Sequence, residues 1–319
     1  MKKIISIVLV LSLALVLAAC GAGTASKMTM GTGGTAGTYY AFGCVLAQYI
    51  NNNTDVEVNV VSTDGSKANI ESIDAGDYQL GTVQSDVMAY AWAGTRSFEE
   101  AGAVQSFRVV GGLYAEAVQL VTMDPEIQSV ADLAGKKVSI GAPGSGVYFN
   151  AIDVLTAAGL TEEDIEPQYM SFADSADGLK DGKIDAAFIV AGAPTAAITE
   201  LCTTNDAYLV PIDGDIAQTL MDASPYYTLY TIPADTYKGQ TEDVVTVTVK
   251  ATLIVSADAS EDAVYALTKA IFDNTAAIAA ENGKGAELSV ENATSGMTAP
   301  FHAGAAKYFA EKGVNVVTE

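Results

Sequence analysis

The chain has 319 residues, half of them apolar, with 16 basic and 39 acidic side chains. The net charge of −23 and the presence of only two arginines, Arg96 and Arg108, argue against binding to DNA or RNA, because clustered Lys and Arg supply most of the affinity for phosphate backbones. Only 17% of the residues are charged, which argues against a disordered acidic tail. The composition predicts an acidic globular protein long enough for two domains.

The first residues have the pattern of a secretory signal. Lys2 and Lys3 precede an apolar run from Ile4 to Ala19, which is shorter than the roughly 20 residues of a membrane-spanning helix. A buried or spanning helix is the alternative interpretation. Leu17-Ala-Ala-Cys20 resembles a bacterial lipobox, and this resemblance implies cleavage before Cys20 and a lipid on its sulfur. We therefore expect a signal peptide over 1–19, a lipid-anchored tether over 20–26, and an extracytoplasmic folded part that reaches the membrane only through this anchor.

The residues of common hydrolytic sites are scarce. His302 is the single histidine, no CxxC or other metal-ligand spacing occurs, and no Gly-x-Ser-x-Gly elbow presents a nucleophile. We expect no metal, no cofactor and no enzymatic activity. Cys44 and Cys202 could pair in an exported protein, but two buried free thiols are the favoured interpretation.

The first block of predicted elements alternates strands with helices. An apolar strand from Met28 enters a Gly-rich loop over 31–38, and a helix follows over 39–51. A strand over 57–61, a helix over 67–75, a turn at Gly76 and a buried strand ending at Val83 come next. Gln84-Ser-Asp86 then begins another helix, where Ser85 is either a plain N-cap or a ligand contact.

A second block repeats this plan. A strand ending near Ile140 enters the loop over 141–147, and a helix over 147–158 stops at Gly159. A turn at Gly182 precedes a buried strand and the segment Ala191-Gly-Ala-Pro-Thr195, where Pro194 is expected at a helix start and Gly192 beside a ligand. Two similar blocks in the same order predict two lobes built on one plan.

The remaining elements complete the fold. We expect an apolar strand over 244–255, a long helix from Ser260 to Glu281, and a last helix that ends near Lys312 before Gly313. The stretches 118–121 and 244–255 are predicted to cross between the lobes. The fold class is therefore α/β with two lobes, each a mostly parallel sheet flanked by helices, and the ligand cleft lies between them. Lobe 1 comprises 27–114 and 245–319, and lobe 2 is the inserted segment 115–244.

The two Gly-rich loops are the candidate ligand site. A strand that runs through such a loop into a helix leaves backbone N–H groups pointing outward at the positive end of the helix dipole, which favours a bound anion. The glycines could instead only permit tight turns. A nucleotide site is poorly supported, because the first loop lacks the lysine of a Walker A motif and has Ala36 at the last glycine of the dinucleotide fingerprint.

Several aromatic residues allow two interpretations. Helical neighbours point about 100° apart, so at most one of Tyr39 and Tyr40 is expected to face the cleft. Of Tyr226 and Tyr227, one is expected in the cleft and one in the core. His302 is expected to be a plain surface or core residue.

A series of motifs, in order and over nearly all of the mature chain, resembles one known family. The motifs are Gly31-Thr-Gly-Gly-Thr-Ala-Gly-Thr-Tyr-Tyr40, Val83-Gln-Ser-Asp-Val87, Gly135-Lys-Lys-Val-Ser-Ile-Gly-Ala-Pro-Gly-Ser-Gly146, Asp181-Gly-Lys-Ile-Asp-Ala-Ala-Phe188, Ala191-Gly-Ala-Pro194, Pro225-Tyr-Tyr227, Val264-Tyr-Ala-Leu-Thr-Lys-Ala270 and Pro300-Phe-His-Ala-Gly304. The chain is similar in them to the TAXI family, the solute receptors of tripartite ATP-independent periplasmic (TRAP) transporters. It implies a type II-like periplasmic-binding-protein fold that closes over a small anionic solute, such as glutamate or 2-oxoglutarate, and delivers it to TRAP-type permease subunits.

The resemblance also implies which residues bind the solute. These are Gly33, Thr35, Thr38, Tyr39, Gln84, Ser85, Gly144, Ser145, Gly146 and Gly192. Because neither arginine lies in these segments, recognition is expected to be local, through loop amides and hydroxyl groups. Two other classes remain open: a surface-anchored sensory module that signals to a receptor, and an extracellular hydrolase.

Overall fold

The structure, a computed structural model, describes residues 26–319. The predicted signal peptide, Cys20 and most of the predicted tether lie outside the described residues. The strands are β1 (Ser26–Gly31), β2 (Val56–Val61), β3 (Leu80–Gln84), β4 (Phe107–Thr122), β5 (Lys137–Ser139), β6 (Glu166–Gln168), β7 (Ala186–Ala191), β8 (Tyr208–Val210), β9 (Thr228–Ile232) and β10 (Val244–Ser256). The α-helices are α2 (Thr38–Asn53), α3 (Ser66–Asp74), α4 (Ser85–Ala93), α5 (Val147–Ala157), α6 (Phe172–Lys180), α7 (Ala196–Thr204), α8 (Gly214–Ala223), α9 (Glu261–Phe272), α10 (Thr275–Glu281), α11 (Val290–Thr294) and α12 (Ala303–Glu311).

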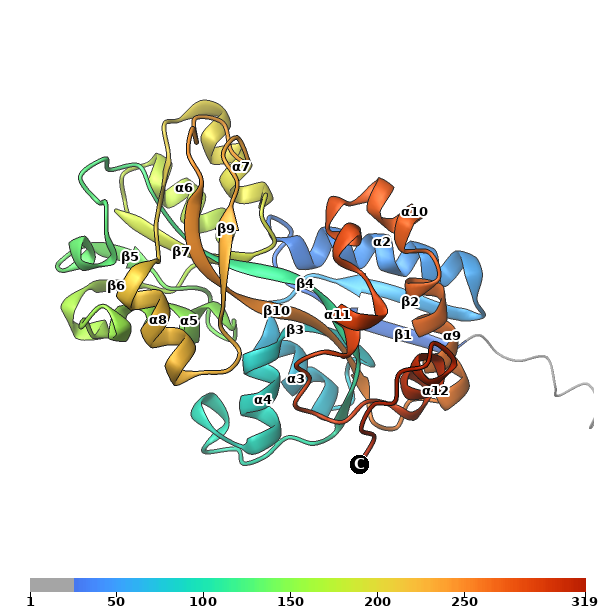
Figure 1. Ribbon diagram of the computed structural model, residues 1–319. Helices are drawn as coiled ribbons and strands as arrows, with labels where there is room; N and C mark the ends of the chain where they lie inside the picture. Colours follow the sequence, from blue (N-terminus) through green and yellow to red (C-terminus); the bar gives the residue numbers. More distant parts are fainter. Residues whose placement is uncertain (1–25) are drawn as a thin grey trace, which may run out of the picture.

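A mixed sheet runs through the described part of the chain in the order β2-β1-β3-β10-β4-β7-β5-β6, with β8 paired to β4 and β9 to β10. Strands β1 to β3 pair in parallel at one end, and β5 to β7 pair in parallel at the other. The 16-residue β4 and the 13-residue β10 are antiparallel to each other and run between the two groups (Figure 1). β10 pairs with β3 of the first group and β4 pairs with β7 of the second, so the two strands together connect the two lobes.

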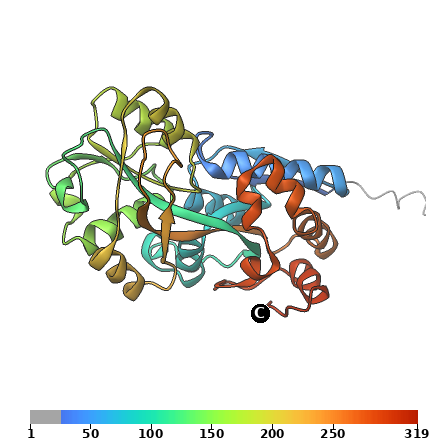
Figure 2. The same cartoon turned by 45° about the horizontal axis from the view of Figure 1, so that its top comes forward.

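Helices cover the sheet in both groups. Figures 1 and 2 show α2, α9, α10 and α12 around β1 and β2, and α5 to α8 around β5 to β7. The predicted α/β fold with two lobes is confirmed. Its sheet is mixed, because the two long connecting strands are antiparallel to their neighbours. No helix among residues 26–319 is long and apolar enough to cross a bilayer.

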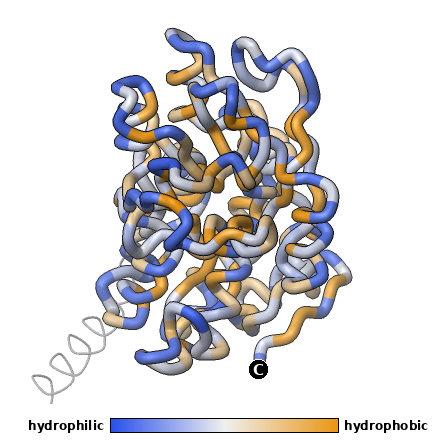
Figure 3. Tube along the Cα trace, turned by 90° about the vertical axis from the view of Figure 1, so that its left-hand side faces the viewer, coloured by the Kyte–Doolittle hydropathy of each residue, from blue (hydrophilic) through white to orange (hydrophobic). Residues whose placement is uncertain are grey.

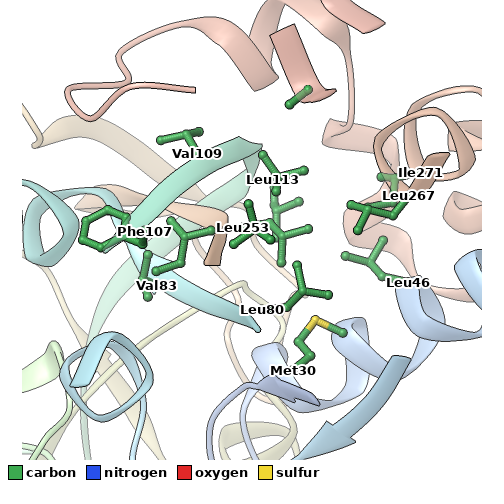
Figure 4. Packing of buried hydrophobic residues seen from close by; sticks show 14 of the residues in the cluster. Met30, Leu46, Leu80, Val83, Phe107, Val109, Leu113, Leu253, Leu267 and Ile271 are labelled. Carbon is green, nitrogen blue, oxygen red and sulfur yellow. The ribbon is translucent and has the colours of Figure 1, made fainter. Parts of the chain in front are cut away.

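The apolar core is divided in the same way. One cluster packs β1, β3 and β4 against α2 and α9, with Met30, Leu46 and Leu267 fully buried (Figure 4). Two further clusters lie on the two faces of the other end of the sheet, around Phe188 and Ile189. Hydrophilic segments lie mainly at the outside of the trace and apolar ones toward its middle (Figure 3). Alternate residues of β7 therefore serve different cores, as expected of a strand that is covered on both sides.

Most predicted elements of the first block are confirmed within two residues. The predicted helices over 39–51 and 67–75 are α2 and α3, and the predicted strand over 57–61 is β2. The predicted long helix from Ser260 to Glu281 is wrong, because it breaks between α9 and α10 at Asp273-Asn274. There the Asn274 side chain donates to the carbonyl of Ala270, while Asp273 accepts from Tyr308 and Lys312. Side-chain contacts of this kind compete with helix continuation.

Two local predictions are corrected. Pro194 does not begin a helix: α7 begins at Ala196, with Thr195 as its N-cap. Cys44 and Cys202 are free thiols as favoured, but only Cys202 is buried. Cys44 is exposed because the buried face of α2 runs through Phe42, Leu46 and Ile50, and position 44 lies on the opposite face.

Candidate functional site

A cleft of about 360 Å³ opens where the Gly-rich loops approach each other. Its lining comes from five segments and several single residues: 33–39, 62–66, Gln84, Glu116, Ala142, 145–147, 170–173 and 190–191. Both groups of parallel strands contribute, because the segments after β1 and β2 meet those after β5 and β6. The cleft therefore lies at the carboxyl ends of parallel strands, where ligands of open α/β sheets bind.

Three helix N-termini reach the cleft without a side-chain cap. Gly37, Gly65 and Gly146 are the N-cap residues of α2, α3 and α5, and none of these helices has an acidic residue in its first turn. The first N–H groups of a helix have no partner within the helix and lie at the positive end of its dipole, although in α3 the Ala68 N–H already donates to Gly144. The uncapped starts provide donors for an anionic group without any basic side chain.

Ser145 lies in the second Gly-rich loop and lines the cleft. Its residue is 7% exposed, and its Oγ is a buried atom without a hydrogen-bond partner among the described residues. Gly141 permits this arrangement with a φ of 95°, and a Cβ at Gly141 would lie only 2.8 Å from that Oγ. A buried hydroxyl without a partner costs free energy unless a ligand satisfies it.

Glu116 is a buried carboxyl group in the same cleft. It lies on β4 with 2% exposure, and the Tyr39 hydroxyl donates to its Oε2 at 2.5 Å. Burial raises the pKa of Glu116 well above its ordinary value, although the hydrogen bond from Tyr39 opposes the increase. Burial and the adjacent Glu116 also raise the pKa of Tyr39. The Tyr39 hydroxyl therefore stays protonated and donates to the carboxyl group of Glu116.

Seven of the ten predicted site residues line the cleft: Gly33, Thr35, Thr38, Tyr39, Gln84, Ser145 and Gly146. The other three lie just behind it. The Ser85 hydroxyl accepts from the backbone N–H of Lys250 at 3.2 Å, and Gln84 takes the N-cap position of α4. Gly144 and Gly192 offer backbone carbonyls to the opposite lobe. Whether any of the ten binds a solute stays a prediction.

Several lining residues were missed from the sequence. The loop over 62–66 repeats the strand, glycine and helix-start pattern at Gly65, and this pattern could have indicated it. Glu116 is the single charged residue in the otherwise apolar strand over 109–122, a signal for a buried functional carboxylate. Met170 to Ala173 belong to the start of α6 and carry no sequence signal that we recognise.

The structure also decides between the interpretations of the two tyrosine pairs and of His302. Tyr39 lines the cleft and Tyr40 does not, whereas neither Tyr226 nor Tyr227 is in the lining. Tyr227 is buried because its hydroxyl joins Asn150 and Asp153 at the base of α5. His302 is buried and caps α12, with Nδ1 accepting from the N–H of Gly304.

No basic residue of the described chain lines the cleft. Arg96 instead pairs with Asp153, and Arg108 packs over Trp92. Among residues 26–319, no group of His, Cys, Asp and Glu side chains is arranged to hold a metal ion. Amides, hydroxyls and two acidic side chains, Asp64 and Glu116, are therefore the polar groups that the cleft offers.

Direct hydrogen bonds join the two lobes around the cleft. The Thr38 hydroxyl donates to the carbonyl of Gly192 at 3.0 Å, and the Ala68 N–H donates to the carbonyl of Gly144 at 3.2 Å. On the side of α4, the Gln84 amide donates to Asn150 Oδ1 at 2.6 Å. These contacts hold the two groups of strands together across the cleft.

Comparison with known proteins agrees with this architecture. The model of the NMT1-like family matches residues 30–313. Among solved structures, the chain is similar to the alkanesulfonate-binding protein SsuA from Xanthomonas axonopodis pv. citri bound to MOPS, with 18% identity, 91% of this chain and 92% of that chain covered, and a TM-score of 0.52. It is also similar to PhnD1 from Prochlorococcus marinus in complex with methylphosphonate, with 12% identity, coverage of 78% and 84%, and a TM-score of 0.51.

A third similar structure is the ligand-binding component of an ABC-type import system from Staphylococcus aureus, with 9% identity, coverage of 80% and 78%, and a TM-score of 0.51. At sequence identities this low, the similarity shows a shared fold and nothing more. The fold is that of the extracytoplasmic solute-binding proteins of transport systems.

Proposed function

Because this chain belongs to the NMT1-like family, we propose that it is an extracytoplasmic receptor that captures a small carboxylate-bearing solute by closure of its lobes and hands it to a membrane permease. The observation that carries the proposal is the convergence of three uncapped helix N-termini and the unpartnered Ser145 hydroxyl on one cleft. The two similar proteins described with MOPS and methylphosphonate support a small solute bearing an anionic group.

The proposed lobes are 27–114 with 245–319, and 115–244. In the open receptor, the starts of α2 and α3 form one half of the site and the start of α5 forms the other. The solute's anionic group accepts hydrogen bonds from loop N–H and hydroxyl groups, and Tyr39 packs on its carbon skeleton. Closure bends β4 and β10, excludes water from the cleft and forms the contacts between the lobes, so these contacts favour the bound state.

We further propose that the permease is of the TRAP type and that the receptor is held at the membrane by a lipid on Cys20. Support comes from the resemblance of the Gly31–Tyr40 and Gly135–Gly146 segments to the TAXI receptors. Glutamate and dicarboxylates such as 2-oxoglutarate are the first solutes to test. The driving force is then an ion gradient across the membrane, with no ATP consumed.

Two experiments test these proposals. Isothermal titration calorimetry with amino acids, oxo acids and dicarboxylates should detect binding of at least one carboxylate by the wild-type protein, and no binding by any of them would contradict the receptor function. Uptake into proteoliposomes that contain the TRAP-type permease subunits should then require the receptor and an ion gradient. Uptake that depends on ATP would contradict the TRAP assignment, and binding without any uptake would favour the sensory alternative.

A further inference from the structure

Glu116 is the one buried carboxyl group among the described residues that line the cleft, and it has a single hydrogen-bond donor within the described chain. The Tyr39 hydroxyl donates to Oε2 at 2.5 Å, and no described side chain or backbone N–H donates to Oε1. The side chain nevertheless lies at the cleft with 2% exposure. Glu116 Oε1 is not among the fully buried polar atoms without a partner, so it is open to the cleft, where a donor on a solute can reach it.

The charges around the cleft favour a donor with positive charge. The lining carries the acidic residues Glu116 and Asp64 and no Lys, Arg or His among the described residues. Asp86 on α4 adds a buried carboxyl group nearby, and Lys284 is engaged with Glu287 at 2.8 Å. A dianionic solute would place like charges together, whereas an ammonium group beside Glu116 would neutralise one of them.

The position of Tyr39 sets the spacing between the N–H groups at the start of α2 and the carboxyl group of Glu116. Its backbone lies in the first turn of α2, where the unsatisfied N–H groups are, and its hydroxyl reaches Glu116. The amide donors and the carboxyl acceptor are therefore one tyrosine side chain apart. An α-amino acid can bridge this gap, with its carboxylate on the helix N–H groups and its ammonium on Glu116.

We propose that Glu116 accepts the ammonium group of the solute, so that the receptor takes amino acids in preference to the oxo acids of the same carbon skeleton. This inference rests on the proposed receptor function and narrows its substrate class. It assigns a specificity role to a residue on the connecting strand β4, outside the Gly-rich loops.

Proton release accompanies this mode of binding. Without solute, burial raises the pKa of Glu116, opposed in part by the Tyr39 hydrogen bond and Lys284 and reinforced by Asp86. Tyr114 beside it on β4 is neutral, because burial raises the pKa of its hydroxyl well above the ordinary value. An arriving ammonium group stabilises the carboxylate and lowers this pKa, so the protons that Glu116 loses on binding pass to the buffer.

Titration calorimetry at pH 7 tests the inference with matched pairs: L-glutamate and 2-oxoglutarate, L-alanine and pyruvate, L-leucine and 4-methyl-2-oxopentanoate. Repeating each titration in phosphate and Tris buffer reports the protons released, because the two buffers differ in ionisation enthalpy. In the wild type, the amino acid of the binding pair should bind at least ~10-fold more tightly than its oxo acid. Its binding should also release protons, because the ammonium group lowers the pKa of Glu116.

Glu116→Gln keeps the size of the side chain but cannot carry a negative charge. It therefore tests whether the carboxylate of Glu116 binds the ammonium group. It should lower the amino-acid affinity ~10-fold or more, abolish proton release and leave the oxo-acid affinity within a factor of about three. Equal affinities within a pair, or an unchanged preference in Glu116→Gln, would overturn the ammonium subsite while the receptor function stands. No binding by any of the six acids, or by any other carboxylate of the wider panel, would overturn the receptor function and the subsite together. The wild-type preference and proton release decide the question even if the variant does not fold.

Discussion

Arg96 and Asp153 form an ion pair, with Arg96 Nη2 and Asp153 Oδ1 2.8 Å apart, that joins the segment after α4 to helix α5. The guanidinium group also lies 5.1 Å from the ring centroid of Tyr90 and 5.4 Å from that of Phe149. The other carboxylate oxygen of Asp153 accepts from the Tyr227 hydroxyl at 2.9 Å. Since the two partners belong to opposite proposed lobes, this pair is formed in the closed arrangement.

Arg96→Ala should therefore weaken solute binding without touching the cleft. A partly exposed ion pair with an aromatic partner contributes about 1 kcal/mol, so the affinity should fall roughly fivefold. Calorimetry with the tightest-binding carboxylate of the panel measures the effect. Lys183→Ala is the control, because Lys183 pairs with Asp181 within one lobe. Equal affinities of Arg96→Ala and the wild type would show that the pair does not contribute to closure.

Ser145→Ala should lower solute affinity and leave the stability of the free protein nearly unchanged. The hydroxyl has no partner in the closed cleft, so its removal costs nothing until a solute arrives. Loss of one hydrogen bond to a charged group predicts about a tenfold decrease in affinity. Ser97→Ala is the matched control, because the Ser97 Oγ is also buried without a partner among the described residues but lies outside the cleft. If both variants change affinity equally, the Ser145 hydroxyl does not contact the solute.

Gly146→Ala should disrupt both the cleft and the contact between the lobes. A Cβ at this position would lie 1.4 Å from Gln84 Oε1, so Gln84 would have to leave its place and its hydrogen bond to Asn150. We expect at least a tenfold loss of affinity from the loss of a buried amide contact and the altered start of α5. Gly283→Ala is the control, since a Cβ at Gly283 meets nothing within 4 Å. Retained affinity in Gly146→Ala would contradict the role given to Gln84.

The buried Asp86 should make stability fall as the pH rises. Burial raises its pKa from 3.8 to about 6, so between these values the folded chain binds the proton more tightly than the unfolded chain does. The stability contribution is present below pH 3.8 and is lost as the pH rises through about 6. As the pH rises through this range, the unfolding free energy of the wild type should therefore fall by up to about 3 kcal/mol relative to that of Asp86→Asn.

Urea unfolding of both proteins at pH 4 and pH 7.5 measures this difference. Asp181→Asn is a control of opposite sign, because Lys183 lowers the pKa of Asp181 and the wild-type carboxylate gains stability as the pH rises. A difference between Asp86→Asn and the wild type that does not vary with pH would show that Asp86 ionises normally.

The sequence predicted the loop sites better than the cleft as a whole. Gly-rich segments at the ends of strands have a local pattern, so the starts of α2 and α5 could be placed from residues 31–38 and 141–147. The position of Glu116 in the cleft could not be placed in this way: a single charge in an apolar strand indicates a buried carboxyl group, but the pairing of β4 with β10 brings it to the cleft. Contacts between distant segments decide such positions, and no local pattern of residues reports them.

Contacts with distant elements also explain why Tyr227 and Ser85 do not line the cleft. Tyr226 and Tyr227 follow a proline in a segment that resembles the family, but Tyr227 is drawn toward Asp153 and Asn150 beneath α5. Ser85 stands at a helix start as expected, yet its hydroxyl is used by the backbone of β10. In both cases a hydrogen bond to a distant element, invisible in the local sequence, determines the direction of the side chain.

The most direct test of the account is a crystal structure of the protein purified without refolding, which retains a solute acquired in the cell. The account predicts density for a small molecule in the cleft, with its carboxylate on the N–H groups that begin α2 or α5 and on the Ser145 hydroxyl. A closed structure whose cleft holds only water, or a solute bound elsewhere on the chain, would contradict it.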